Sequence, residues 1–208
     1  LSSRTCAPAG PGAHGGKRME ALAEIVIVPA DADVLSAARG GSQDAGRRLM
    51  AEHGPSMVRT AWNVLGRYGG NEADDVVQEA FIAALTTRAL PTGDLGAWLR
   101  AIAARKALDH VRRSRRRGER PLVDPEAPGV ERASGESPKA RLEVLMVRQG
   151  LRRLSPADRA VLTLVDLEGR SMAEAAEALG LTNVAVRLRA VRARRKLARL
   201  LRSGEGAA

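Results

Sequence analysis

The segment 171–197, SMAEAAEALGLTNVAVRLRAVRARRKL, contains two stretches of helical periodicity on either side of a glycine. The first stretch begins with a capping box, in which the Ser171 hydroxyl accepts from a free N–H of the first turn and Glu174 reaches back to the backbone. Gly180 suits the left-handed residue that ends a helix, and Thr182 can cap the helix that follows. The segment therefore predicts a helix-turn-helix.

The second helix of this pair combines an apolar stripe with many arginines. Its apolar residues recur at helical spacing and can pack on the preceding helices: Val186, Ala190, Ala193 and Leu197. Residues 186–202 contain no acid, and the free N–H groups at a helix start attract phosphate. An arginine-rich solvated helix is the alternative, but the caps and the glycine turn favour a DNA-binding motif. The candidate DNA contacts are Ser171, Thr182, Asn183, Arg187, Arg189, Arg192 and Arg194.

The composition agrees with a helical protein that binds a polyanion. Lys and Arg number 34 against 24 Asp and Glu, so the net charge of the 208-residue chain is +10. This balance favours nucleic acid, an anionic membrane surface or an acidic protein as partner. Aromatic residues make up 2% of the chain, too few for a protein that stacks every base of a single strand. The bias toward alanine, leucine and arginine predicts an all-α fold.

Several functional classes are not expected from this sequence. Cys6 is the only cysteine, so an internal disulfide and a cysteine-rich metal site are excluded. We find no paired carboxylates, no phosphate-cradling glycine loop and no nucleophile with its base, so we expect neither a cofactor nor enzymatic activity. No apolar run approaches the ~18 residues of a membrane span. We expect a cytoplasmic protein without membrane insertion.

The first predicted domain covers residues 31–117. Its helices are expected over 42–67, with a break or kink at Gly54-Pro55, and then over two capped segments: 72–88 after Asn71 and 95–113 after Asp94. This domain ends in DHVRRSRRR, which places five arginines in six consecutive positions. The chain therefore carries a second basic cluster, on a helix separate from the helix-turn-helix.

The rest of the chain is assigned to a second domain, a linker and two ends. A helix is expected over 138–153, and Ser155 with Pro156 predicts the start of another. Pro, Gly and acidic residues without periodicity indicate a flexible linker. The predicted boundaries are 1–30 for a disordered leader, 118–137 for the linker, 138–202 for the second domain and 203–208 for a tail.

Three segments together resemble bacterial sigma factors of the extracytoplasmic-function (ECF) type. The first is NEADDVVQEAFIAAL, close to the family pattern D-x-x-Q-E-x-F through Asp75, Gln78, Glu79 and Phe81. The second is GAWLRAIAARKALDHVRR, and the third runs from LSPADRAVL through the helix-turn-helix. The resemblance covers most of residues 42–201. It implies a protein that binds core RNA polymerase and promoter DNA, controlled by an anti-sigma factor.

The resemblance also implies roles for particular residues. The acidic helix 72–88 would dock on the polymerase through Asp74, Asp75, Gln78 and Glu79, although acids near a helix start are also common without any partner. The loop 86–95 and the helix 95–117 would bind the minus-ten promoter element, and the helix-turn-helix would read the minus-thirty-five element. The minus-ten contacts would be Arg100, Arg105, Lys106, His110, Arg112 and Arg113. Trp98 is assigned to the core because it falls on the apolar stripe.

Some residues depart from the family pattern, and other functions remain open. The loop 86–95 is short, Lys106 stands where Asn is common, and Val184-Ala185 replaces Gly-Thr. Leu188 replaces a small polar residue, so it could contact a thymine methyl or a protein partner. The main alternative function is a helix-turn-helix regulator that does not dock on polymerase. A membrane-surface protein is less suited, since the basic helices lack a bulky apolar face.

Overall fold

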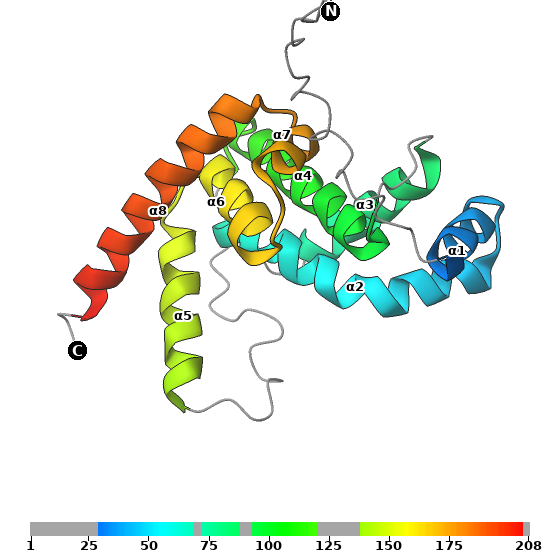
Figure 1. The fold of residues 1–208 in the computed structure, drawn as a ribbon, viewed down its shortest axis with the longest axis horizontal. Helices are drawn as coiled ribbons and strands as arrows, with labels where there is room; N and C mark the ends of the chain where they lie inside the picture. The colour runs from blue at the N-terminus through cyan, green and yellow to red at the C-terminus, as the bar shows by residue number, and fades with distance from the viewer. Residues whose placement is uncertain (1–28, 69–71, 88–92, 120–137, 206–208) are drawn as a thin grey trace, which may run out of the picture.

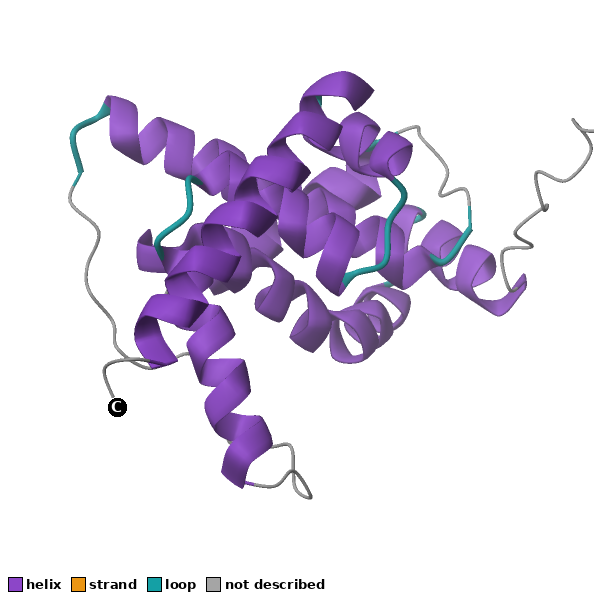
Figure 2. Ribbon diagram, turned by 60° about the vertical axis from the view of Figure 1, so that its left-hand side comes forward, coloured by secondary structure: helices purple, strands orange, loops and turns teal. Residues whose placement is uncertain are grey.

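The computed structural model describes residues 29–68, 72–87, 93–119 and 138–205, and within these ranges the chain is helical and contains no strand (Figures 1 and 2). The all-α prediction is confirmed. Most of the predicted leader and most of the predicted linker lie outside the described residues, as do Cys6 and Asn71, and the last two leader residues, 29 and 30, begin a helix. The proposed domain boundaries therefore stay predictions.

The N-terminal region consists of four helices and a short 3-10 turn. Their bounds are α1 (Pro29–Arg39), α2 (Gln43–Leu65), η1 (Gly66–Tyr68), α3 (Glu72–Thr86) and α4 (Leu95–Arg116). The long helices α2 and α4 pack along each other, and α3 packs on both (Figure 1). The side chains between them are fully buried, among them Met57, Leu65, Leu99, Leu108 and Val111.

This region differs from the sequence prediction in two places. A break at Gly54-Pro55 is wrong, since α2 continues through Pro55 to Leu65, while the alternative, a kink there, stays a prediction. The Ser56 hydroxyl donates to the His53 carbonyl at 2.8 Å, a side-chain hydrogen bond within the turn that contains the proline. Helix α1 was not predicted at all. It is held by tertiary contacts with α2 and α3, and its Leu35 is 2% exposed.

The C-terminal region contains α5 (Pro138–Arg152), α6 (Pro156–Leu162), the π-helical turn η2 (Thr163–Leu167), α7 (Met172–Leu179) and α8 (Asn183–Glu205). Helices α5 and α8 extend together away from the rest of the molecule (Figure 1). Gly150 permits this packing, because a Cβ there would stand 2.5 Å from Leu197 Cδ1. The stripe predicted to face the preceding helices is confirmed: Val186, Ala190 and Ala193 are at most 1% exposed.

The predicted helix caps are confirmed wherever the structure describes them, although α4 ends at Arg116 and not at the predicted 113. Asp94 accepts from Ala97 N at 2.7 Å, and Ser155 accepts from Asp158 N at 3.2 Å. Both halves of the capping box at Ser171 are present. Gly180 adopts φ 62°, the left-handed conformation that ends α7 and turns the chain toward α8. Thr182 accepts from Ala185 N at 3.2 Å. The helix-turn-helix of α7 and α8 is therefore formed as predicted.

The two regions are packed on each other through one continuous set of buried side chains. Helix α6 contacts α2 and α4, and α7 contacts α4. Arg159 of α6 is 3% exposed and donates across the boundary to the carbonyls of Val64 and Leu65, both at 2.9 Å. Gly66 leaves room for it, because a Cβ there would stand 2.7 Å from Arg159 Cζ. A buried arginine therefore caps the C-terminal end of α2 from the other region.

Candidate polymerase-binding and DNA-binding surfaces

The acidic helix α3 presents the four predicted docking residues to solvent. Asp74, Asp75, Gln78 and Glu79 are all exposed, while Val76, Val77 and Ala80 between them are buried against the core. The helix therefore separates an apolar face from a polar one, as the sequence predicted. Acids in its first turn also interact favourably with the positive end of the helix dipole. The exposed face can accept hydrogen bonds and attract cations from a partner.

One edge of this acidic face already contacts polar side chains of α4. Glu79 lies 3.3 Å from Arg113 Nη2 and 4.0 Å from Lys106 Nζ. Glu72 lies 2.5 Å from His110 Nε2. These pairs fix the basic side of α4 against α3. The structure gives Asp74 and Asp75 no such ion pair, so their carboxylates are the most available part of the face.

The six residues predicted to contact the minus-ten element do not lie on a single face of α4. Lys106, His110 and Arg113 point to the acids of α3, as described above. Arg100 binds Glu168 of the other region, and its Nη2 lies 3.6 Å from Asp94. Only Arg105 and Arg112 are exposed, and Arg112 lies 3.1 Å from Asp109 in the next turn. Sequence spacing therefore identified a basic helix but not which of its cations are available.

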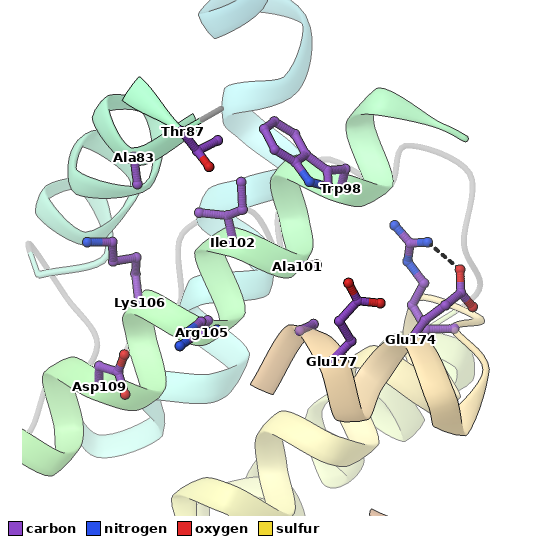
Figure 3. Close-up of a pocket in the computed structure, with 12 residues that line it drawn as sticks. Ala83, Thr87, Trp98, Ala101, Ile102, Arg105, Lys106, Asp109, Glu174 and Glu177 are labelled. Atoms are coloured by element: carbon purple, nitrogen blue, oxygen red, sulfur yellow. Dashed lines mark hydrogen bonds and ion pairs between the residues drawn. The ribbon is translucent and has the colours of Figure 1, made fainter. Parts of the chain in front are cut away.

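A cleft of about 580 Å³ lies beside the contact between α4 and α7 and is also bordered by α3 (Figure 3). Trp98, Ile102 and Arg105 line its α4 side, and Glu174 and Glu177 line the side of α7. Trp98 is only half-buried, so it packs at the edge of the core and also borders the cleft. Of the six residues predicted to contact the minus-ten element, Arg105 and Lys106 line this cleft, whose opposite wall carries the acids of α7.

The helix-turn-helix residues fall into three groups by their contacts. Ser171 and Thr182 are helix caps. Asn183, Arg187 and Arg192 are exposed. Two arginines bind acids of their own region instead: Arg189 lies 3.2 Å from Asp158, and Arg194 donates to both oxygens of Asp166, from Nη2 at 2.5 Å and from Nε at 3.0 Å. The hydrogen bond to Asp166 raises the pKa of Arg194 further above its usual value. The exposed group is therefore available for DNA in this structure.

Sequence reasoning missed the residues that join the two regions. Glu168 accepts from the Thr60 hydroxyl at 2.6 Å and from Arg100, and Arg159 caps α2. No local pattern marks these residues, because the partners of Glu168 and Arg159 in the other region are 68 to 108 residues away in the chain. Among the described residues, no group of three or more His, Cys, Asp or Glu could hold a metal ion. In the same part of the chain, no helix is long and apolar enough to span a bilayer.

Two family models match the two regions in the order that the fold has them. Sigma-70 region 2 matches residues 49–117, and Sigma-70 region 4 matches residues 145–197. The first match covers most of α2 and all of α3 and α4. The second begins within α5 and includes α7 and most of α8, as far as residue 197. Each structural region therefore corresponds to one of the two family regions.

Individual relatives agree with these matches. The chain is 36% identical to the RNA polymerase sigma factor CnrH of Cupriavidus metallidurans, over 83% of this chain and 96% of CnrH. It is 33% identical to the ECF RNA polymerase sigma factor BldN of Streptomyces coelicolor, over 81% of this chain, and spans 65% of the length of BldN. The solved structure of CnrH in complex with the cytosolic domain of CnrY superposes with a TM-score of 0.55, at 32% identity, covering 84% of this chain and 98% of CnrH. The chain belongs to the ECF sigma factors of the sigma-70 family.

Proposed function

We propose that this chain directs core RNA polymerase to promoters, with α3 docking on the polymerase, α4 binding the minus-ten element and α8 reading the minus-thirty-five element as duplex. The observation that carries this proposal is the presence of three surfaces of suitable charge on one chain. They are an exposed acidic face on α3, a basic end on α4 and a basic helix in a helix-turn-helix. A plain DNA-binding regulator would not need the first of them.

The charge of each surface suits the role proposed for it. Asp74 and Asp75 can pair with cations of a polymerase subunit, whereas the same acids would repel DNA. Helix α8 has no acid from Asn183 to Gly204, so its whole length attracts phosphate. Each phosphate that a cation neutralises adds about 0.9 to the salt slope of duplex binding, so binding should weaken steeply with salt.

The cleft beside α4 also suits the minus-ten role. Trp98 and Ile102 offer apolar surface on which an unstacked base can lie, and Arg105 lies close enough to hold the adjoining phosphate. In the packed arrangement Glu174 and Glu177 occupy the opposite wall of this cleft. Their carboxylates would repel a nucleic acid strand, so α7 has to move away before DNA can enter.

The spacing of the two promoter elements requires the same movement. Their names place them about 25 base pairs apart, which is roughly 85 Å of duplex at 3.4 Å per pair. Helices α4 and α7 contact each other in this structure, so their DNA-binding surfaces cannot reach both elements at once. We therefore assign the packed arrangement to a resting form of the protein and an extended arrangement to the promoter complex.

An anti-sigma protein is included in the proposal as a further partner. The related CnrH has been solved in complex with the cytosolic domain of CnrY, and a partner of that kind could hold the present chain in its resting form. We also place the chain in the cytoplasm, where polymerase and promoters are found. The proposal involves no catalytic step by this chain itself.

The docking surface is tested by reversing charge on α3. We expect Asp75→Arg to lower the affinity for core polymerase at least tenfold, because one carboxylate is lost and a like charge is placed against the partner's cations. The matched control is Asp33→Arg, which reverses an exposed acid on α1. Affinity is measured by titrating labelled protein with core polymerase at fixed salt, and circular dichroism checks that both variants stay folded.

Two results would reject this surface. The first is equal affinity of Asp75→Arg and the unchanged protein for core polymerase. The second is an equal loss in Asp75→Arg and Asp33→Arg, which would reflect net charge rather than a specific contact.

A further inference from the structure

The outer face of α8 carries apolar side chains where a DNA-reading helix usually presents polar ones. Val184 is 74% exposed, Leu188 is 48% exposed and Val191 is 44% exposed. They are four and three residues apart, so they form one stripe along the helix. The buried residues Val186 and Ala190 lie on the opposite side. The stripe is therefore directed away from the core, on the part of α8 that leads from the helix-turn-helix turn.

The surroundings of the stripe favour a polyanion as its occupant. Arg187 and Arg192 are exposed on either side of the stripe, and α8 has no acid before Glu205. Arg189 and Arg194 point back to acids of their own region, so they do not cover the stripe. An apolar strip between two cations matches a major groove, where base edges lie between two phosphate backbones.

We infer that Val184 and Leu188 read thymine methyl groups in the upstream promoter element. This inference rests on the proposed function, since it names what α8 recognises there. An aliphatic side chain can neither donate nor accept a hydrogen bond, so it gains only from the thymine C5-methyl, the apolar group that base edges display in the major groove. The two residues stand about 6 Å apart along the helix at 1.5 Å per residue. That distance spans roughly two base-pair steps at 3.4 Å each.

The consequence is a defined sequence preference. Leu188 and Val184 should select two thymines that lie about two base pairs apart. This spacing follows from the rise of about 1.5 Å per residue in the helix and about 3.4 Å per base pair in the duplex. Val191 lies one helical turn beyond Leu188, toward the edge of the groove. Arg187 and Arg192 would then hold the two backbones and add affinity without sequence preference.

Replacing thymine by uracil tests the inference, because it removes the C5-methyl and leaves the hydrogen-bonding edge unchanged. Holoenzyme assembled from core polymerase and this chain first selects its preferred duplexes from a randomised upstream element. Each selected thymine is then replaced by deoxyuridine, and the dissociation constant is measured. We expect about fourfold weaker binding at one or two positions. This factor corresponds to the free energy gained when one methyl group is withdrawn from water.

Variants of Leu188 complete the test. Leu188→Ala should bind thymine and uracil duplexes equally at one of these positions, whereas the control Leu188→Met, which keeps an apolar side chain of similar volume, should still prefer thymine. Since Leu188 is largely exposed, neither change should alter the melting temperature appreciably.

The outcomes separate the inference from the proposed function. If holoenzyme selects upstream elements but uracil binds as well as thymine everywhere, the methyl contact is wrong and the function stands. A thymine preference that Leu188→Ala and Val184→Ala both retain also overturns it. A photo-crosslinker at position 188 that labels a polymerase subunit instead of DNA assigns the stripe to protein. If no upstream sequence is selected at all, the proposed function fails together with the inference.

Discussion

At the scale of single residues, Arg159 has the largest consequence for the structure. Its guanidinium is buried and donates to main-chain carbonyls, including those of Val64, Leu65 and Leu154, each at 2.9 Å. Carbonyls at the end of a helix carry partial negative charge, which compensates a buried cation. One side chain thus ends α2 and fixes α6 on it at the same time.

Removal of this side chain should cost substantial stability. In Arg159→Ala the three carbonyls lose their donor, and each buried unsatisfied group costs about 1–3 kcal/mol. Because water can enter the space, we expect the free energy of unfolding to fall by about 2–4 kcal/mol in total. Urea denaturation followed by circular dichroism measures the change. The control Arg153→Ala removes an exposed arginine nearby, and equal midpoints for the two variants would contradict this role for Arg159.

At the scale of helices, short-range signals account for what the sequence predicted correctly. The caps at Asp94, Ser155 and Ser171 and the turn at Gly180 each depend on residues three or four positions away, so they can be recognised without the fold. The acidic face of α3 was predicted for the same reason, since its periodicity is local. The resemblance to the sigma family then supplied the roles of these helices, which the local signals do not contain.

What the sequence did not predict depends on contacts between distant segments. Helix α1 is short and gains its order from packing on α2 and α3. Pro55 stays within α2 because residues before and after it in the helix, such as Leu49 and Met57, are buried in the core. This packing outweighs the local cost of proline. The cations of α4 looked equivalent in the sequence, but their acidic partners come from α3 and from Glu168. Their availability was therefore not predictable.

The capping box of α7 gives the helix-turn-helix a pH dependence. Hydrogen bonds from Ser171 hold the pKa of Glu174 below its ordinary value of 4.5. A carboxyl with a lowered pKa in the folded state stabilises the fold above its ordinary pKa, and that contribution is lost as the pH falls through the folded value. We expect the unchanged protein to exceed Glu174→Gln in stability by about 0.5 kcal/mol or less at pH 7, since the carboxylate is partly exposed.

This difference should shrink below pH 4.5 and vanish once the pH has fallen below the lowered pKa of the folded state, where Glu174 is protonated in both states. Thermal melts of both proteins between pH 7 and pH 3 follow it. The control Glu177→Gln removes an exposed carboxylate from the same helix. A stability gap between the protein and Glu174→Gln that stays constant down to pH 3 would contradict the assignment.

At the scale of the whole molecule, charged side chains of one region lie against those of the other. Arg100 is held by Glu168, and Arg105 lines the same cleft as Glu174 and Glu177. The linked regions therefore shield part of the surface that we assign to DNA while leaving the outer face of α8 exposed. Polymerase docking on α3 does not require the regions to part, but engagement of both promoter elements does.

Transcription in a reconstituted system tests the central claim most directly. Core RNA polymerase is supplied with this chain and a library of genomic fragments, and the 5′ ends of the RNA are sequenced, with core polymerase alone as the control. The account predicts discrete start sites, each preceded by the same pair of sequence elements and each absent from the control. RNA whose 5′ ends match those made by core polymerase alone, on every fragment, would contradict it.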